Sequence, residues 1–314
     1  MKTTNYFHNS GTDGLPLSVL RAEPENISDI RGILQLVHGM NEYKERYLDF
    51  IEYLTKHGYV VVIHDHRGHG KSIKNSDDLG FFYDGGFKAL IDDIHEITAE
   101  IKEYVYNLTG NSSLPFILAG HSMGSMAVRC YIKKYDADID KLIVIGCPSE
   151  LPGAKAGLLL IKFFKKILGE RARNMLIAGL VMGTYEKRFK SEGLHTWINS
   201  DYESVKKYCA DPLCNYVFTL NGFENLVRLT LLTYENCGYD LNNPNLPIRF
   251  YSGADDPCAV DEKAFNKAIS LLKQQGYTDV EGKMYKNMRH EILNEPEHMK
   301  VYEDMLAFIE RRLS

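Results

Sequence analysis

This sequence lacks cysteine pairs, long apolar runs and an excess of positive charge. Its six cysteines are scattered without a Cys-x-x-Cys pair, so we expect reduced thiols rather than a disulfide framework or a zinc site. No run approaches the roughly 18 apolar residues of a membrane-spanning helix, and residues 1–5 lack the apolar core of a signal peptide. The net charge of −5 gives no electrostatic case for a nucleic-acid partner. These absences predict a cytoplasmic protein that binds no nucleic acid.

What the chain does contain is a regular alternation of apolar runs and helical periodicity. The expected strands lie at 15–22, 32–37, 59–63, 115–119, 141–147, 248–253 and 281–285. Apolar residues recur at helical spacing at 47–54, 87–105, 126–135, 265–272 and 301–309. Almost wholly apolar strands are typical of a parallel sheet that is covered on both faces. The alternation therefore predicts an α/β fold, with a mostly parallel central sheet flanked by helices.

The alternation breaks after the strand at 141–147 and resumes only at 248. This gap far exceeds the dozen or so residues that a crossover between parallel strands requires. Its apolar pattern is helical. We therefore assign 150–243 to a helical cap, or lid, inserted between late strands, and 1–149 and 244–314 to the core.

One stretch carries the chemistry. An apolar run leads into Gly120-His121-Ser122-Met123-Gly124, and a helical pattern follows. A strand, a sharp turn and a helix with serine at the apex form a nucleophile elbow, in which strain lifts the hydroxyl clear of the sheet. Gly120, His121 and Gly124 complete this elbow, with glycine where a Cβ would collide with a neighbouring element. Because a serine hydroxyl is a weak nucleophile, the motif also requires a histidine base and a group to orient it.

The loops after the last two expected strands offer the acid and the base. Catalytic groups of open α/β sheets lie beyond the carboxyl ends of strands, where Asp256 and His290 are found. The order Ser122, Asp256, His290 is that of serine-elbow hydrolases. Asp255 competes for the role of the acid. We favour Asp256 because Pro257 restricts it to an extended backbone that suits a side chain projecting towards the histidine.

The tetrahedral intermediate of acyl transfer needs two backbone N–H groups aimed at its oxyanion. Met123 directly follows the nucleophile at the start of a helix. Met40 follows a buried strand, and Gly39 before it lets the chain turn close to the site. We expect the amides of Met40 and Met123 to form the oxyanion hole.

Five segments resemble the monoacylglycerol lipase and lysophospholipase group of α/β-hydrolases, which also includes serine-aminopeptidase-like members. They are HGMNEY at 38–43, DHRGHGKS at 65–72, GHSMGS at 120–125, GADDP at 253–257 and RHE at 289–291. The resemblance implies the α/β-hydrolase fold and covers nearly the whole chain outside the cap. It places Ser122, Asp256 and His290 on the family triad and Met40 and Met123 on its oxyanion hole. It gives the segment at 65–72 a supporting role.

These features predict a serine ester hydrolase of the monoacylglycerol lipase or lysophospholipase type, which forms an acyl-enzyme on a small-molecule or lipid ester. Two alternatives stay open: an aminopeptidase-like or thioesterase hydrolase, and a hydrolase-fold ligand-binding protein with little turnover. An aminopeptidase would need an acidic anchor for the ammonium group of its substrate. We expect no cofactor and no metal. The spacing of His64, His66 and His69 is typical of dinuclear metallohydrolases, but Gly68 stands where those loops place an aspartate.

The first half of the cap combines basic and apolar residues. Between 151 and 192 there are nine basic and three acidic residues, although the whole chain is acidic. Apolar residues at 157, 160, 161, 164 and 168 share one helical face. Two interpretations follow. The helix either packs on the core with solvated lysines, or forms a lid that lines an acyl pocket and brings a basic rim to anionic membrane lipid.

Overall fold

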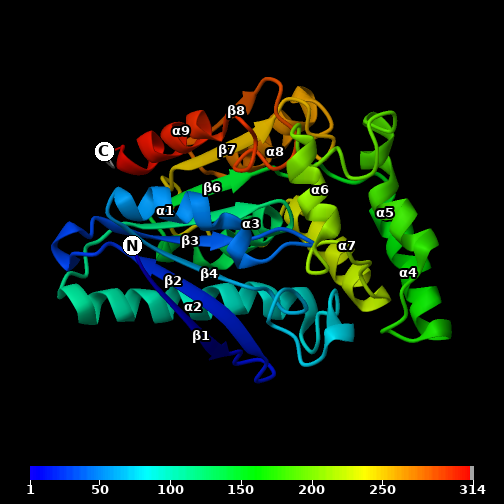
Figure 1. Cartoon of the computed structure of the whole chain (residues 1–314), viewed down its shortest axis with the longest axis horizontal. Coiled ribbons are helices and arrows are strands. Elements are labelled where there is room, and N and C mark those ends of the chain that lie inside the picture. Colours follow the sequence, from blue (N-terminus) through cyan, green and yellow to red (C-terminus); the bar gives the residue numbers. More distant parts are fainter. Residues whose placement is uncertain (312–314) are drawn as a thin grey trace.

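An eight-stranded sheet organises the fold (Figure 1). The computed structural model describes residues 1–311. The strand order is β1-β2-β4-β3-β5-β6-β7-β8; β3 to β8 pair in parallel, whereas β1 and β2 pair antiparallel. The strands are β1 (Lys2–Asn9), β2 (Pro16–Glu23), β3 (Gly32–Val37), β4 (Tyr59–His64), β5 (Phe116–His121), β6 (Lys141–Ile145), β7 (Ile248–Gly253) and β8 (Val280–Tyr285). The predicted α/β fold with a mostly parallel sheet is confirmed.

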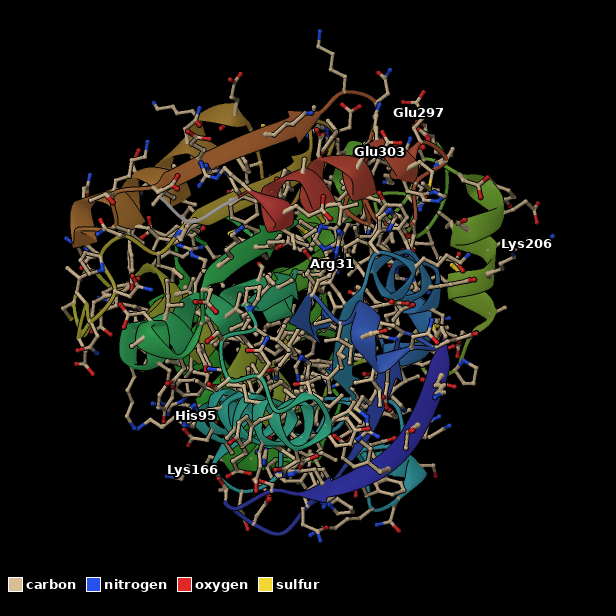
Figure 2. The ribbon with its side chains drawn as sticks, turned by 90° about the vertical axis from the view of Figure 1, so that its left-hand side faces the viewer. Arg31, His95, Lys166, Lys206, Glu297 and Glu303 are labelled. Atoms are coloured by element: carbon tan, nitrogen blue, oxygen red, sulfur yellow. The ribbon has the colours of Figure 1, made fainter. Side chains whose placement is uncertain are left out.

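Helices cover both faces of this sheet. They are α1 (Leu48–Lys56), α2 (Gly86–Thr109), α3 (Met123–Tyr135), α8 (Glu262–Gln275) and α9 (His298–Glu310). Four short 3₁₀ turns lie in the connections between elements: η1 (Ile27–Asp29), η2 (Lys44–Tyr47), η3 (Ser76–Asp78) and η4 (Asp136–Asp138). All five regions with predicted helical periodicity are helical. Figure 2 shows the charged side chains of Glu297, directly before α9, and of Glu303, within α9, on the exposed outer surface.

Alternate residues of each buried strand enter two separate core layers. Leu34 and Leu36 of β3 belong to the layer that contains α1 and α9, whereas Ile33 and Val37 of the same strand belong to the layer that contains α2, α3 and α8. Because successive side chains of a strand point to opposite faces, both sets are apolar, and every residue of β3 is buried. Burial of both faces of these strands therefore explains the nearly continuous apolar runs in the sequence.

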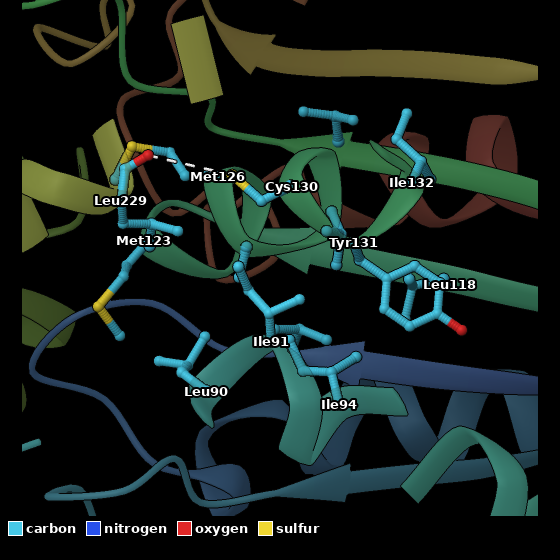
Figure 3. Packing of buried hydrophobic residues seen from close by; sticks show 14 of the residues in the cluster. Leu90, Ile91, Ile94, Leu118, Met123, Met126, Cys130, Tyr131, Ile132 and Leu229 are labelled. Carbon is cyan, nitrogen blue, oxygen red and sulfur yellow. Dashed lines mark hydrogen bonds between the residues drawn. The ribbon is translucent and has the colours of Figure 1, made fainter. Parts of the chain in front are cut away.

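The layer beneath the nucleophile helix is the more extensive one. Figure 3 shows Met126 and Cys130 of α3 among apolar side chains of α2 and the side chain of Leu229, which lies in segment 150–243. The Cys130 thiol approaches the Leu229 carbonyl oxygen at 4.0 Å. Helix α3 is thus buried between α2 and segment 150–243, and this fixes the position of the turn that precedes it.

Strand β1 was not predicted. Only two of its eight residues, Tyr6 and Phe7, are large apolar side chains, and most of the strand is exposed. It is held by pairing along its whole length with β2 and by His8, whose Nδ1 lies 2.5 Å from Glu100 Oε2 of α2. Backbone pairing at a sheet edge leaves little hydrophobic pattern in a sequence.

Segment 150–243 contains helices and no strand. These are α4 (Ala154–Leu168), α5 (Met175–Arg188), α6 (Tyr202–Ala210) and α7 (Leu220–Tyr234). Figure 1 shows α4 and α5 at one end of the molecule. Helix α7 packs on both α4 and α3, so it joins the outer helices to the core, and the division into core and cap stays a prediction. Among residues 1–311 no helix is long and apolar enough to cross a membrane.

Candidate active site

Ser122 occupies the turn between β5 and α3. Its backbone angles are φ 53° and ψ −116°, a conformation that costs a non-glycine residue free energy and persists only where the surroundings impose it. The surroundings do so here: the Ser122 N–H donates to the Ile145 carbonyl of β6 at 2.9 Å, and the Ser125 hydroxyl donates to the Ser122 carbonyl at 2.6 Å. The strained turn presents the Ser122 side chain to a pocket.

The two glycines of the turn allow close packing. A Cβ on Gly120 would overlap the Gly124 backbone, and a Cβ on Gly124 would overlap the carbonyl groups of Val37 and His38. The nucleophile helix therefore lies directly against the end of β3. The neighbouring loop is equally close, because a Cβ on Gly39 would lie 3.0 Å from the Ser122 Cβ.

The loops after β7 and β8 bring Asp256 and His290 together. The His290 Nδ1–H donates to Asp256 Oδ2 at 2.9 Å, and the Cys258 N–H donates to Asp256 Oδ1 at 2.8 Å. Burial favours the neutral acid, but the His290 imidazole and the Cys258 amide hold the pKa of Asp256 below its usual range. Asp256 is therefore a carboxylate that fixes one tautomer of His290.

Asp255, the competing acid, is placed elsewhere. Its side chain is 44% exposed and pairs with Arg188 of α5 at 3.3 Å. The structure thus brings Asp256, and not its neighbour, to the imidazole.

One pocket unites the predicted residues. Met40, Ser122, Met123 and His290 all line it. Met123 is the first residue of α3, and N–H groups in a first helical turn have no partner within the helix. Within residues 1–311, Ser122 Oγ makes no hydrogen bond to His290, a contact that in resting enzymes often tightens only when substrate binds.

The histidines of the segment at 64–69 support the site from behind. The His66 N–H donates to His38 Nε2 at 2.9 Å, and His66 Nε2–H donates to the His38 carbonyl at 3.0 Å, which fixes the loop that carries Met40. Burial holds the pKa values of His64 and His66 well below the usual range and lowers that of His69 to about 4. In the described part of the chain, these three rings do not bring three ligand atoms within 4.8 Å of one another.

A second buried pair lies beside the imidazole, and the sequence analysis missed it. Glu42 Oε1 lies 2.9 Å from His121 Nδ1, and Tyr47 OH donates to Glu42 Oε2 at 2.5 Å. His121 Nε2–H donates to the His290 carbonyl at 3.2 Å. Burial alone would lower the pKa of His121, but Glu42 raises it, and His121 lowers the pKa of Glu42 to about 2 despite its burial. The pair is thus an imidazolium and a carboxylate.

The sequence held only a weak signal for this pair. His121 was assigned to the elbow and Glu42 to the HGMNEY segment, and nothing in either motif links two residues so far apart in the chain. A second acid, Glu291, is paired as well: Arg46 Nη2 lies 2.6 Å from each of its carboxylate oxygens. Glu42 and Glu291 are the only acidic residues among the described residues that line the pocket.

The remaining wall is mostly apolar. It includes Met126, Leu151, Val181, Met182, Ile198, Leu226 and Val227. The free volume of this pocket is small, about 70 Å³. A neighbouring cavity of about 310 Å³, between α4, α5 and α7, shares Leu151, Val181 and Val227 with it. Two aromatic rings of segment 150–243, Tyr185 and Trp197, complete the lining near His290. The sequence analysis singled out neither.

Comparison with known proteins gives consistent results. The family model described as serine aminopeptidase, S33, matches residues 28–297. A monoacylglycerol lipase of Mycolicibacterium smegmatis is 24% identical over 90% of this chain and 89% of its own. A probable lysophospholipase L2 of Haemophilus influenzae is 24% identical over 88% of this chain and 82% of its own. The crystal structure of a thermostable carboxyl esterase from Bacillus coagulans, in complex with glycerol, superposes with a TM-score of 0.88 at 26% identity, covering 98% of each chain.

Proposed function

Because the chain belongs to the serine aminopeptidase S33 family of hydrolases, we propose that it is a serine ester hydrolase of the monoacylglycerol lipase and lysophospholipase type. The observation that carries the proposal is the pocket itself. A strained serine, a histidine held by a buried carboxylate and a mostly apolar wall meet in it. The lipase, lysophospholipase and esterase relatives support the same reaction class.

The proposed reaction is a two-step acyl transfer. His290 Nε2 accepts the Ser122 proton while Ser122 Oγ attacks the ester carbonyl carbon. The N–H groups of Met40 and Met123 stabilise the oxyanion. His290 then gives its proton to the leaving alcohol, and an acyl-enzyme remains. Water, deprotonated by His290, then attacks the acyl-enzyme; the bond to Ser122 Oγ breaks, His290 returns the proton to Oγ and the acid is released. The Asp256 carboxylate keeps the imidazole in its working tautomer throughout.

The charges around the pocket favour an uncharged ester over an aminoacyl amide. An ammonium group would need a free carboxylate, and the two acids of the lining are paired, Glu42 with His121 and Glu291 with Arg46. Binding an ammonium group there would break one of these pairs, and separating a buried pair is costly. The aminopeptidase-like alternative is therefore the weaker one.

The apolar wall suits a medium or long acyl chain. The cavity between α4, α5 and α7 adjoins the pocket at Leu151, Val181 and Val227. A chain that leaves Ser122 past these three side chains would fill it and remove its apolar surface from water, at roughly 0.8 kcal/mol for each buried methylene group. A short acetyl group would leave the cavity unfilled.

The outer surface of the cap supports contact with membrane lipid. Large apolar side chains of α4 and α5 are exposed: Leu159, Phe163, Ile167, Leu168, Met175, Leu176 and Leu180. The face predicted for α4 is only partly buried, because Ile161 is covered whereas Leu168 is 51% exposed. Exposed apolar side chains on two adjacent helices, with Lys162 and Lys166 exposed among them, fit a lid that rests on an anionic lipid surface.

Labelling and turnover test this function together. A fluorophosphonate should label the wild-type protein and the matched Ser270→Ala variant, whose serine is exposed on α8, but not Ser122→Ala. Turnover should then be compared on monoacylglycerols, lysophospholipids, short esters, thioesters and aminoacyl amides. Fast hydrolysis of aminoacyl amides with little ester hydrolysis would replace the proposal by the aminopeptidase alternative. Tight lipid binding without turnover would indicate a binding protein.

A further inference from the structure

Trp197 is the only tryptophan in the chain, and it lies against the proposed catalytic histidine. The centroid of its indole is 5.2 Å from that of the His290 ring, with 46° between the ring planes. The side chain is 7% exposed. Asp256 holds the imidazole at Nδ1, and the His121 ring lies 4.8 Å away from it. Trp197 supplies a further contact, from the cap.

The indole is itself fixed by the last turns of α5. Its Nε1–H donates to Glu186 Oε1 at 3.1 Å, and the Tyr185 ring lies 5.2 Å from it. Glu186 also accepts a hydrogen bond from the His195 amide. One residue pair of α5 thus determines where the indole lies against His290.

The chain on either side of Trp197 is tied to the histidine loop. The Glu291 N–H donates to the Ile198 carbonyl at 2.8 Å. Arg289, directly before His290, donates from Nη1 to the Thr196 carbonyl at 2.5 Å and from Nη2 to Glu192 at 2.7 Å. Residues 192–198 are therefore hydrogen-bonded to the loop that carries the imidazole. The exposed apolar side chains lie elsewhere, on α4 and the start of α5.

We propose that Trp197 is a positioning residue that holds the His290 imidazole against Asp256, and that Glu186 anchors it to α5 of the cap. The inference rests on the proposed role of His290 as general base. A displaced imidazole reduces the rate of proton transfer without weakening substrate binding to the same degree, because the wall of the pocket is mostly formed by other residues. The cap is thereby coupled to the chemistry as well as to substrate binding.

The first test separates turnover from binding. Trp197→Ala should lower kcat by roughly 10- to 100-fold with a KM change below about threefold. Trp197→Phe keeps an aromatic ring against His290 but loses the hydrogen bond to Glu186, so its kcat should lie between those of Trp197→Ala and the wild type. Glu186→Ala, which loses the same hydrogen bond, should have a similar kcat. Tyr202→Ala is the matched control, since this aromatic ring is 65% exposed on the neighbouring α6. If Trp197→Ala changes only KM, or if Trp197→Phe does not recover any kcat, the positioning role is wrong and Trp197 only lines the pocket.

The second test uses the fluorescence of the single tryptophan and requires no variant of it. An adjacent imidazolium quenches indole emission more strongly than a neutral imidazole does. When pH is varied, the tryptophan emission of the wild-type protein should therefore change with the same midpoint as the acid limb of its kcat/KM profile. His290→Gln should abolish this change in emission. The other titratable groups around the imidazole and the indole are Asp256, His121, Glu42, Cys258, Tyr185, Glu291, Glu186 and His195. A titration that persists in His290→Gln belongs to one of these and overturns the proposal.

Failure of this inference and failure of the proposed function are distinguishable. If Ser122→Ala keeps its activity, the proposed reaction is wrong, whatever the fluorescence does. If the fluorophosphonate labels Ser122 and Trp197→Ala retains wild-type kcat, the reaction stands and the positioning role is wrong. If Trp197→Ala does not fold, the kcat of Glu186→Ala decides, because a value equal to that of the wild type would refute the positioning role.

Discussion

Replacing Glu42 by glutamine should destabilise the protein, and should do so most at mildly acidic pH. Glu42 is the buried counter-ion of the His121 imidazolium, at 2.9 Å. Glutamine keeps the size of the side chain and removes its charge. The imidazolium must then either stay buried without a partner or give up its proton, and both outcomes cost free energy of folding.

The pKa of Glu42 gives the magnitude. A fall from the usual 4.5 to about 2 corresponds to ~3 kcal/mol at roughly 1.4 kcal/mol per pH unit, and breaking a buried pair typically costs 3–5 kcal/mol. The lowered pKa of Glu42 gives stability that is present above about 4.5 and is lost as pH falls towards 2. The raised pKa of His121 gives stability that is present below 6.5 and is lost as pH rises through the folded value. The full effect therefore lies between about pH 4.5 and 6.5.

Urea denaturation measures this effect. The free energy of unfolding of Glu42→Gln should be lower than that of the wild type by ~3 kcal/mol at pH 6, and the difference should shrink at pH 9. The matched control is Glu203→Gln, whose side chain is 68% exposed on α6 and should change stability by less than about 0.5 kcal/mol. A difference below 1 kcal/mol at pH 6, or one that grows towards pH 9, would refute the charged pair.

Four further predictions concern activity. Ser122→Ala should lower kcat by roughly 10³-fold or more while the melting temperature stays near that of the wild type; near-normal esterase activity would disprove the acyl-enzyme route. Asp256→Asn should lower kcat by up to about 10⁴-fold and Asp255→Asn only slightly, and the reverse ranking would move the acid by one residue. Ester hydrolysis should survive exhaustive chelation, whereas loss with recovery on added zinc would point to His64, His66 and His69. Turnover should rise from acetyl to longer acyl esters, and liposome binding should require anionic lipid and weaken with salt; an acetyl preference without liposome binding would leave a cap that only packs on the core.

Local patterns in the sequence were sufficient for the framework of the fold. Each predicted strand and helix is present, because buried parallel strands are nearly all apolar and surface helices repeat at 3.6 residues. The Ser122 turn was equally readable, since its glycines and its serine are contiguous. The proximity of Asp256 and His290 was predictable because loops after successive parallel strands meet at one edge of a sheet. Strand β1 was missed because it is held by pairing and not by apolar burial.

The contacts that surround the site were decided only by the tertiary structure. Glu42 and His121 meet because β3 and β5 are adjacent in the sheet, although no local spacing relates them. Trp197 reaches His290 because the chain between α5 and α6 is hydrogen-bonded to the loop after β8. A sequence records which side chains are apolar or reactive over a few residues. Which distant side chains become neighbours, and hence which buried charges are paired, depends on the order of the strands and the packing of segment 150–243.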